Sequence, residues 1–230
     1  MILTNVSDSV QLVYTMRNDI STSKKIISLA EKLPYFGVEN LRLADVEPDY
    51  LKTILSRQAK KGEFIRIKKG LYTTKSFIER IKAENKYSLF LESLASEAYS
   101  PSYLSLEYIL YQNNILTESP INFTLVTKNK TADFSNQLGN FIYHKIKDDL
   151  FLGFKAIKEQ EFSIYKATKA KALFDFLYIR KNLLINRETI KELRLNLEEM
   201  LPKDIKELKG YVKSEGSAKM KKIYGELGIN

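Results

Sequence analysis

The chain of 230 residues has no cysteine and a single histidine, His144. Without cysteine it can form no disulfide and no thiolate metal site, and one histidine excludes any site built from several histidines. These absences do not exclude a site in which carboxylates alone hold a magnesium ion. The sequence also lacks a glycine-rich phosphate loop and the setting of a serine or cysteine nucleophile. We therefore expect no catalytic residues, no metal site and no cofactor.

Long apolar runs are also missing. No stretch approaches the roughly 18 residues that a membrane-spanning helix needs, and Asp8 precedes the mildly apolar stretch from Val10 to Met16, so no signal-peptide pattern is present. We expect a cytoplasmic protein with no membrane partner. With 44% hydrophobic and 11% aromatic residues, the chain can bury one large or two small cores.

Positive charge is concentrated in one segment. Eight basic residues lie between Tyr50 and Lys75, opposed there only by Glu63, whereas the whole chain carries a net charge of +9. The rest of the chain is nearly balanced. Solvated protein surfaces usually carry positive and negative side chains interleaved with one another. A segment of a single sign therefore indicates a nucleic-acid contact.

The basic segment also has a recognisable pattern. A helical run from Tyr50 to Lys61 is followed by Gly62, a strand over 63–67, a turn over 68–70 and a strand over 71–74. Further helices are predicted over 6–17, 24–33 and 38–43, with a turn over 44–48 and Asp49 as the cap of the basic helix. The helices over 24–33, 38–43 and 50–61, followed by the basic hairpin, predict a winged helix-turn-helix DNA-binding domain over residues 1–75.

The predicted helix and hairpin indicate which part of the DNA each basic residue would contact. Ser56, Arg57 and Lys60 are placed to face the major groove, and Lys52 a flanking phosphate. Lys68 and Lys69 form the tip of the wing, where Gly70 supplies the positive φ of a tight turn. The complete candidate DNA-binding set is Lys52, Ser56, Arg57, Lys60, Lys61, Arg66, Lys68 and Lys69.

The remainder predicts an α+β domain over 76–185 and a helical extension over 186–230. A polar helical connector is expected over 76–86. Helices are expected over 89–98, from Ser100 onward, and in an apolar segment capped by Thr168, with strands over 121–128, 140–146, 153–158 and 162–165. The extension shows polar helices over 187–200, 203–213 and 218–227, with ten basic and eight acidic residues after Asn182.

Asp175 stands out because it lies inside an apolar helical run. A charge buried there needs a partner, so an internal ion pair or cap is the simplest interpretation. An alternative is an enzyme of nucleic-acid or nucleotide metabolism in which Asp175, or the pair Asp148 and Asp149, holds a metal. Another is a regulator with a small-ligand pocket between Leu104 and Tyr165. His144 is expected to be an ordinary strand residue.

Two blocks of sequence together resemble the AbiEi family of antitoxins and transcriptional regulators. The first runs from Tyr50 to Tyr72, with a helix, the pair Lys61-Gly62, a strand bearing Arg66, and Gly70-Leu71-Tyr72. The second comprises 100–107, 123–127 and 166–175. Where the family often has Pro-Glu-Lys-Ala, this chain has Lys169-Ala170-Lys171-Ala172, so a role for that glutamate does not carry over.

The resemblance implies an N-terminal winged helix that binds repeats in its own promoter and represses the operon. It further implies a second domain that counters a nucleotidyltransferase-like toxin encoded next door, in a type IV toxin–antitoxin system of the kind that aborts phage infection. No tight, stable complex with the toxin is implied.

Overall fold

The protein is an α+β protein, as predicted. The structure, a computed structural model, describes residues 22–42 and 46–229, and the helix predicted over 6–17 lies outside them. The chain divides into two compact units, Met1–Tyr87 and Ser88–Asn230. The division lies after the polar connector rather than at residue 75, and the helices beyond residue 186 belong to the second unit. No helix among the described residues is long and apolar enough to cross a membrane.

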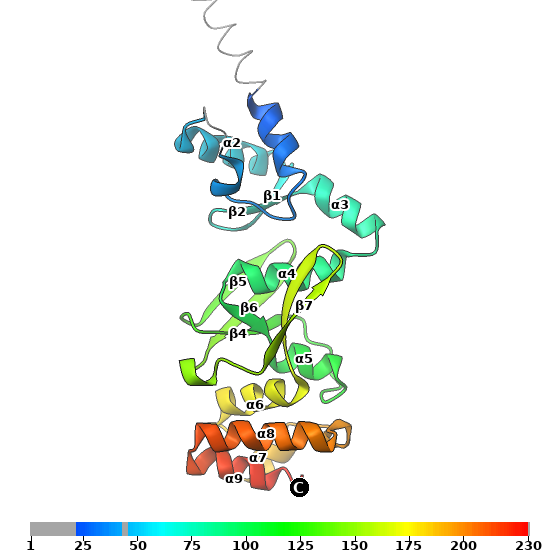
Figure 1. The fold of residues 1–230 in the computed structure, drawn as a ribbon, viewed down its shortest axis with the longest axis vertical. Helices are drawn as coiled ribbons and strands as arrows, with labels where there is room; N and C mark the ends of the chain where they lie inside the picture. The colour runs from blue at the N-terminus through cyan, green and yellow to red at the C-terminus, as the bar shows by residue number, and fades with distance from the viewer. Residues whose placement is uncertain (1–21, 43–45, 230) are drawn as a thin grey trace, which may run out of the picture. The chain divides into compact units, whose positions relative to one another are not determined.

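The first unit is a small group of helices followed by a two-stranded hairpin (Figure 1). Residues 22–30 are helical. The remaining elements are η1 (Glu39–Leu41), α2 (Pro48–Lys60), β1 (Phe64–Lys68), β2 (Leu71–Thr74) and α3 (Lys75–Ala83). The helix over 22–30, η1, α2, β1 and β2 each contribute buried side chains to a core that includes Ile26, Leu51 and Phe64. Burial of this shared apolar face is what holds such short elements together.

Two local predictions for this unit were wrong, and the helical connector was confirmed. The helix expected over 38–43 is a single 3-10 turn, η1. Asp49 does not cap α2, because Glu47 occupies the cap position and Pro48 is the first residue of the helix. The first turn suits proline, since the backbone N–H that proline lacks would have no partner within the helix there. The connector is α3, which Thr74 caps by accepting a hydrogen bond from the backbone N–H of Phe77 at 3.0 Å. The turn expected over 44–48 lies partly outside the described residues.

The second unit is built on a mixed six-stranded sheet in the order β5-β6-β4-β3-β8-β7. The β4–β6 and β3–β8 pairs are parallel and the other neighbours antiparallel. The strands are β3 (Ser102–Leu104), β4 (Phe123–Thr127), β5 (Ala132–Asn136), β6 (Gly139–Lys145), β7 (Phe154–Glu159) and β8 (Phe162–Ala167). The helices are α4 (Tyr87–Ala98), α5 (Leu106–Gln112), α6 (Lys169–Arg180), α7 (Arg187–Lys191), α8 (Pro202–Glu215) and α9 (Ala218–Glu226), with 3-10 turns η2 (Asp148–Leu150) and η3 (Leu197–Glu199).

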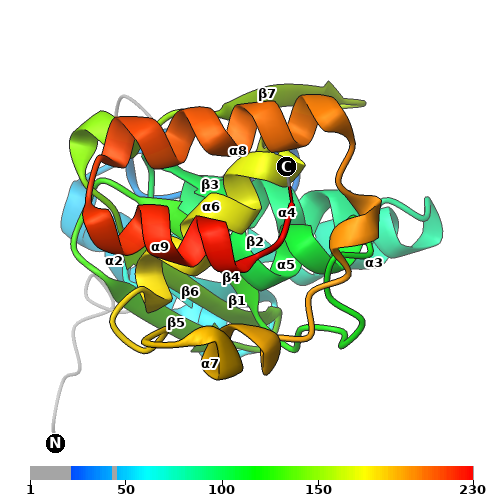
Figure 2. The same ribbon diagram turned by 90° about the horizontal axis from the view of Figure 1, so that it is seen from below.

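Helices cover both faces of this sheet. On one face, the hydroxyl of Tyr143 in β6 donates to the backbone carbonyl of Ala95 in α4 at 2.7 Å. On the other, α6 packs between the sheet and α8, with α9 beside α8 (Figures 1 and 2). Because α6 is enclosed in this way, all eight residues from Ala170 to Leu177 are buried, on every side of the helix. Thr168 caps it as predicted, accepting from the N–H of Lys171 at 3.1 Å.

Two further predictions were wrong in the second unit. The chain from Ser100 does not begin a helix, because residues 102–104 pair with β4 as strand β3 before α5 begins. The helix expected over 187–200 ends at Lys191, and Arg194 then adopts a left-handed conformation with φ of 49° that no helix continues through. Strand β5 was not predicted at all.

Candidate functional site

The solvent-facing side of α2 forms a continuous polar stripe. Its exposed side chains recur at spacings of three and four residues, and they are Asp49, Lys52, Thr53, Ser56, Arg57 and Lys60. The opposite side buries Leu51, Ile54 and Leu55 in the core of the first unit. This amphipathic division fixes which side chains a partner can reach. Of the predicted set, Lys52, Ser56, Arg57 and Lys60 all lie on the stripe, together with Thr53, which sequence reasoning missed.

Asp49 is the single acidic group on that stripe, and it lies at the N-terminal end. It accepts from Lys52 Nζ at 2.9 Å, and this contact lowers the pKa of the Asp49 carboxyl below its usual value. Lys52 is therefore partly occupied by a local ion pair. Within residues 22–42 and 46–229, Arg57, Lys60 and Lys61 form no ion pair. The C-terminal half of α2 thus presents cations that are free to meet a partner.

The hairpin carries the rest of the predicted set. Lys69 and Gly70 form its tip, and Gly70 has φ of 82°, the positive value that the sequence predicted. Arg66 is exposed, with its Nε 3.4 Å from the carbonyl oxygen of Lys68, where the ladder between the two strands shifts register. Lys68 is half-buried rather than fully exposed, so Arg66 and Lys69 are the more accessible cations of the hairpin.

The hairpin is fastened to the helical part of the unit through Phe36. Its backbone N–H donates to the carbonyl of Tyr72 at 2.8 Å, and the N–H of Tyr72 donates back at 2.9 Å. The Phe36 ring packs edge-on against Phe64 with 5.1 Å between centroids. Gly37 follows, where an added Cβ would lie 2.8 Å from the carbonyl oxygen of Gly70. These contacts hold the hairpin tip at a fixed position relative to the core of the unit.

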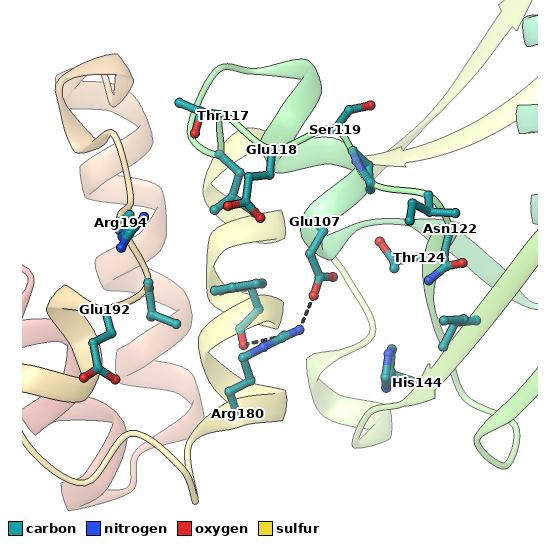
Figure 3. Close-up of a pocket in the computed structure, with 16 residues that line it drawn as sticks. Glu107, Thr117, Glu118, Ser119, Asn122, Thr124, His144, Arg180, Glu192 and Arg194 are labelled. Carbon is teal, nitrogen blue, oxygen red and sulfur yellow. Dashed lines mark hydrogen bonds and ion pairs between the residues drawn. The ribbon is translucent and has the colours of Figure 1, made fainter.

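A cavity of about 800 Å³ opens on the α6 side of the sheet in the second unit (Figure 3). Thr124, Ile142 and His144 line it from β4 and β6. Its other walls come from α5, α6, the loop after α5 and the chain after α7, and they include Glu107, Phe176, Arg180 and residues 116–122 and 192–194.

An ion pair between Glu107 and Arg180 stands in the cavity (Figure 3). Arg180 also stacks its guanidinium on Phe176, 4.0 Å from the ring centroid. Glu107 Oε2 is buried and has no hydrogen-bond partner among the described residues. Burial lowers the pKa of His144, so its imidazole is neutral at pH 7. Sequence reasoning did not single out the Glu107–Arg180 pair, although Glu107 is the last residue of the first stretch, 100–107, in the second block of resemblance.

Asp175 is fully buried and has the internal partner that the sequence predicted. Lys171 Nζ donates to Asp175 Oδ1 at 2.7 Å and to the carbonyl of Leu150 at 2.8 Å. Tyr103 and Ser105 donate their hydroxyls to Oδ2 at 3.0 and 2.8 Å. All four of these hydrogen bonds lie within the core of the second unit. Among the described residues no three histidine, cysteine or acidic side chains gather as metal ligands, and Asp148 and Asp149 lie on the exposed turn η2.

The chain matches no family model, and no curated protein sequence matches it.

Proposed function

We propose that the first unit is a winged helix-turn-helix that binds duplex DNA upstream of its own gene, and that the protein is the antitoxin and autorepressor of an AbiE-type toxin–antitoxin operon. In this assignment α2 is the recognition helix and the β1–β2 hairpin is the wing. The functional partner is a nucleotidyltransferase-like toxin encoded next door. The second unit supplies the antitoxin function.

The observation that carries the DNA-binding part is the exposed stripe of α2. Arg57 and Lys60 stand beside Ser56 on its solvent side without acidic partners among the described residues. Arginine reads guanine through two hydrogen bonds in the major groove, and lysines neutralise phosphates. The Phe36–Tyr72 bridge supports the same assignment, because it fixes the position of the wing relative to the helical core. The antitoxin part depends on the resemblance of the two sequence blocks.

The test is fluorescence anisotropy of the full chain on a labelled duplex from its own upstream region and on a scrambled duplex, across salt concentrations. We expect tighter binding to the upstream duplex at about 0.15 M salt, where non-specific electrostatic binding weakens. Equal binding to both duplexes at every salt concentration would contradict the proposal.

We expect Arg57→Ala to weaken binding to the upstream duplex by about 1–3 kcal/mol and to change binding to the scrambled duplex little, because a base contact exists only at the cognate site. Replacing Lys68 and Lys69 together should weaken both duplexes alike and flatten the salt dependence. Arg80→Ala on α3 is the matched control and should bind like the parent. Equal loss on both duplexes for Arg57→Ala would show that Arg57 contacts phosphate only.

A second candidate function is regulation by a small ligand, and the cavity at Glu107 and Arg180 favours it. Its volume of about 800 Å³ lies in the range of ligand sites. Leu106, next to Glu107, holds φ of 57°, a strained value for a branched residue of the kind that gathers at binding sites. We expect a metabolite panel to include a compound that raises the melting temperature of the protein but not that of Arg180→Ala. A panel in which no compound raises it would remove this candidate.

A further inference from the structure

The cavity of the second unit is lined by one negative and one positive group that lie side by side (Figure 3). Glu107 and Arg180 form an ion pair there through Glu107 Oε1, and their side chains are 27% and 26% exposed. Because the two charges cancel, the pair presents a local dipole to the cavity rather than a net charge.

Both members of the pair keep hydrogen-bonding capacity that the described residues do not use. Glu107 Oε2 is buried and accepts no hydrogen bond from them. Arg180 carries more N–H donors than its two acceptors among the described residues, the carbonyl of Phe176 and Glu107 Oε1, can use. A buried polar atom without a partner is costly and rare in folded proteins. One acceptor and several donors are therefore available to a ligand.

The two charged groups are held in place by their surroundings. Glu107 lies in the first turn of α5, directly after Leu106, which is fully buried and has a φ of 57°. On α6, the guanidinium of Arg180 stacks on the ring of Phe176, 4.0 Å from its centroid. Groups that are already ordered cost less to bind a ligand than groups that must first be fixed.

The other residues around the cavity divide into an apolar set and a charged set. Leu116 and Ile142 line it and are half-buried, and Phe176 is buried. The charged residues of the rim are exposed and form no ion pair within residues 22–42 and 46–229, and they are Glu118, Glu192 and Arg194. An apolar wall beside an ion pair suits a ligand with one charged end and one apolar end.

We propose that this cavity binds a free α-amino acid with an apolar side chain. The ammonium group of the ligand donates to Glu107 Oε2, and its carboxylate accepts from the unused N–H groups of Arg180. Hydrogen bonds between charged groups of this kind are the strong ones. The apolar side chain packs against Leu116, Ile142 and Phe176. This ligand class rests on the second candidate function, in which the cavity is a ligand site.

Other small ligands match the cavity less well. Its lining includes three carboxylates and two guanidinium groups, so the several negative charges of a nucleotide would meet repulsion. A simple amine would leave the donors of Arg180 unused, and a simple carboxylic acid would leave Glu107 Oε2 without a partner. Among the described residues no three histidine, cysteine or acidic side chains gather around a metal position. A zwitterion satisfies both groups and adds no net charge.

The experiment is calorimetric titration of the full chain with L-leucine, L-isoleucine, L-methionine and L-phenylalanine. Each is compared with its matched amine and its matched carboxylic acid, which for leucine are isoamylamine and isocaproate. We expect at least one of these amino acids to bind, and both of its analogues to bind about tenfold more weakly or worse, because each analogue lacks one charged group. This comparison uses the parent protein, so it does not depend on the folding of any variant.

Variants test whether the amino acid binds at this pair. Glu107→Gln and Arg180→Gln each remove one charge and should weaken binding by about tenfold or more. Glu97→Gln is the matched control and should bind like the parent, because Glu97 is exposed on α4, on the opposite face of the sheet. Binding that Glu107→Gln and Arg180→Gln leave unchanged would overturn the proposal.

An amine or carboxylic acid that binds as tightly as its amino acid would also overturn it, since one of the two charged groups would then have no role. If none of the amino acids binds while a nucleotide or nucleobase raises the melting temperature of the parent but not of Arg180→Ala, the cavity keeps its ligand function and loses this ligand class. If no compound of either kind binds, both proposals for the cavity fail.

Discussion

Replacing Lys171 with methionine should destabilise the second unit by about 3–5 kcal/mol, because it leaves the carboxylate of Asp175 buried without its cation. Both side chains of this pair have no exposed surface. Burial raises the pKa of Asp175 and lowers the pKa of Lys171, so each charged form depends on the other. Urea denaturation followed by circular dichroism measures the change in the free energy of unfolding.

The double variant Lys171→Met/Asp175→Leu separates the ion pair from its packing. Removing both charges together should recover most of the lost stability, since a buried ion pair is worth little more than an apolar pair of similar volume. The hydroxyls of Tyr103 and Ser105 then lose their acceptor, which limits the recovery. If the double variant were less stable than Lys171→Met alone, the isolated buried charge would not be the cause of the destabilisation.

Gly153→Ala should be nearly as damaging, with an expected loss of about 2–5 kcal/mol from overpacking and from an alanine held at positive φ. Gly153 has φ of 78°, and an added Cβ would stand 2.2 Å from Tyr211 Oη and 3.0 Å from Lys171 Cγ. Tyr211 has little freedom to move, because its hydroxyl donates to Glu207 and its ring packs on Phe174 with 5.6 Å between centroids. Thermal and urea unfolding measure the loss.

Gly210→Ala is the matched control for this substitution. Gly210 lies inside α8 with no atom within 4 Å of an added Cβ. Alanine there should stabilise the helix by about 0.5–1 kcal/mol, because glycine loses more backbone freedom on folding. Adding Tyr211→Phe to Gly153→Ala should restore part of the stability, since the nearest clashing atom is the hydroxyl oxygen. Equal effects of the two glycine substitutions would contradict the packing argument.

The buried pair changes the meaning of the second block of resemblance. Lys171 and Asp175 both belong to it, and both lie inside the core rather than on a surface that a toxin could contact. A substitution at either position is therefore expected to act on the proposed antitoxin function through the stability of the second unit. Residues that touch a partner directly must be sought on exposed positions of this unit.

Local patterns in the sequence predicted the parts of the candidate interface that depend on local physics. The α2 stripe follows from the spacing of Leu51, Ile54 and Leu55, and the hairpin tip follows from Gly70. Thr168 was recognised as the cap of α6 because a hydroxyl at that position satisfies a free backbone N–H. The assignment of those cations to DNA stays a prediction.

Distant contacts decided the rest. Residues 102–104 have no strong local preference for a strand, and they form β3 because β4 and β8 offer partners on both sides. The cavity at Glu107 depends on α5, α6 and two strands meeting, which no single stretch of sequence encodes. The cap expected at Asp49 was displaced when Pro48 took the first turn of α2.

The sequence by itself determined the α+β class, most helix and strand positions, the concentrated charge of 50–75 and the need of Asp175 for a partner, because each depends on neighbouring residues and on composition. The tertiary structure alone decided that the partner is Lys171, supported by Tyr103 and Ser105 from about 70 positions away. It also decided that the acids of α8 and α9 are buried or half-buried while their lysines face solvent. A net charge counted from the sequence includes the side chains on every side of a helix. Packing then decides which of those side chains remain exposed.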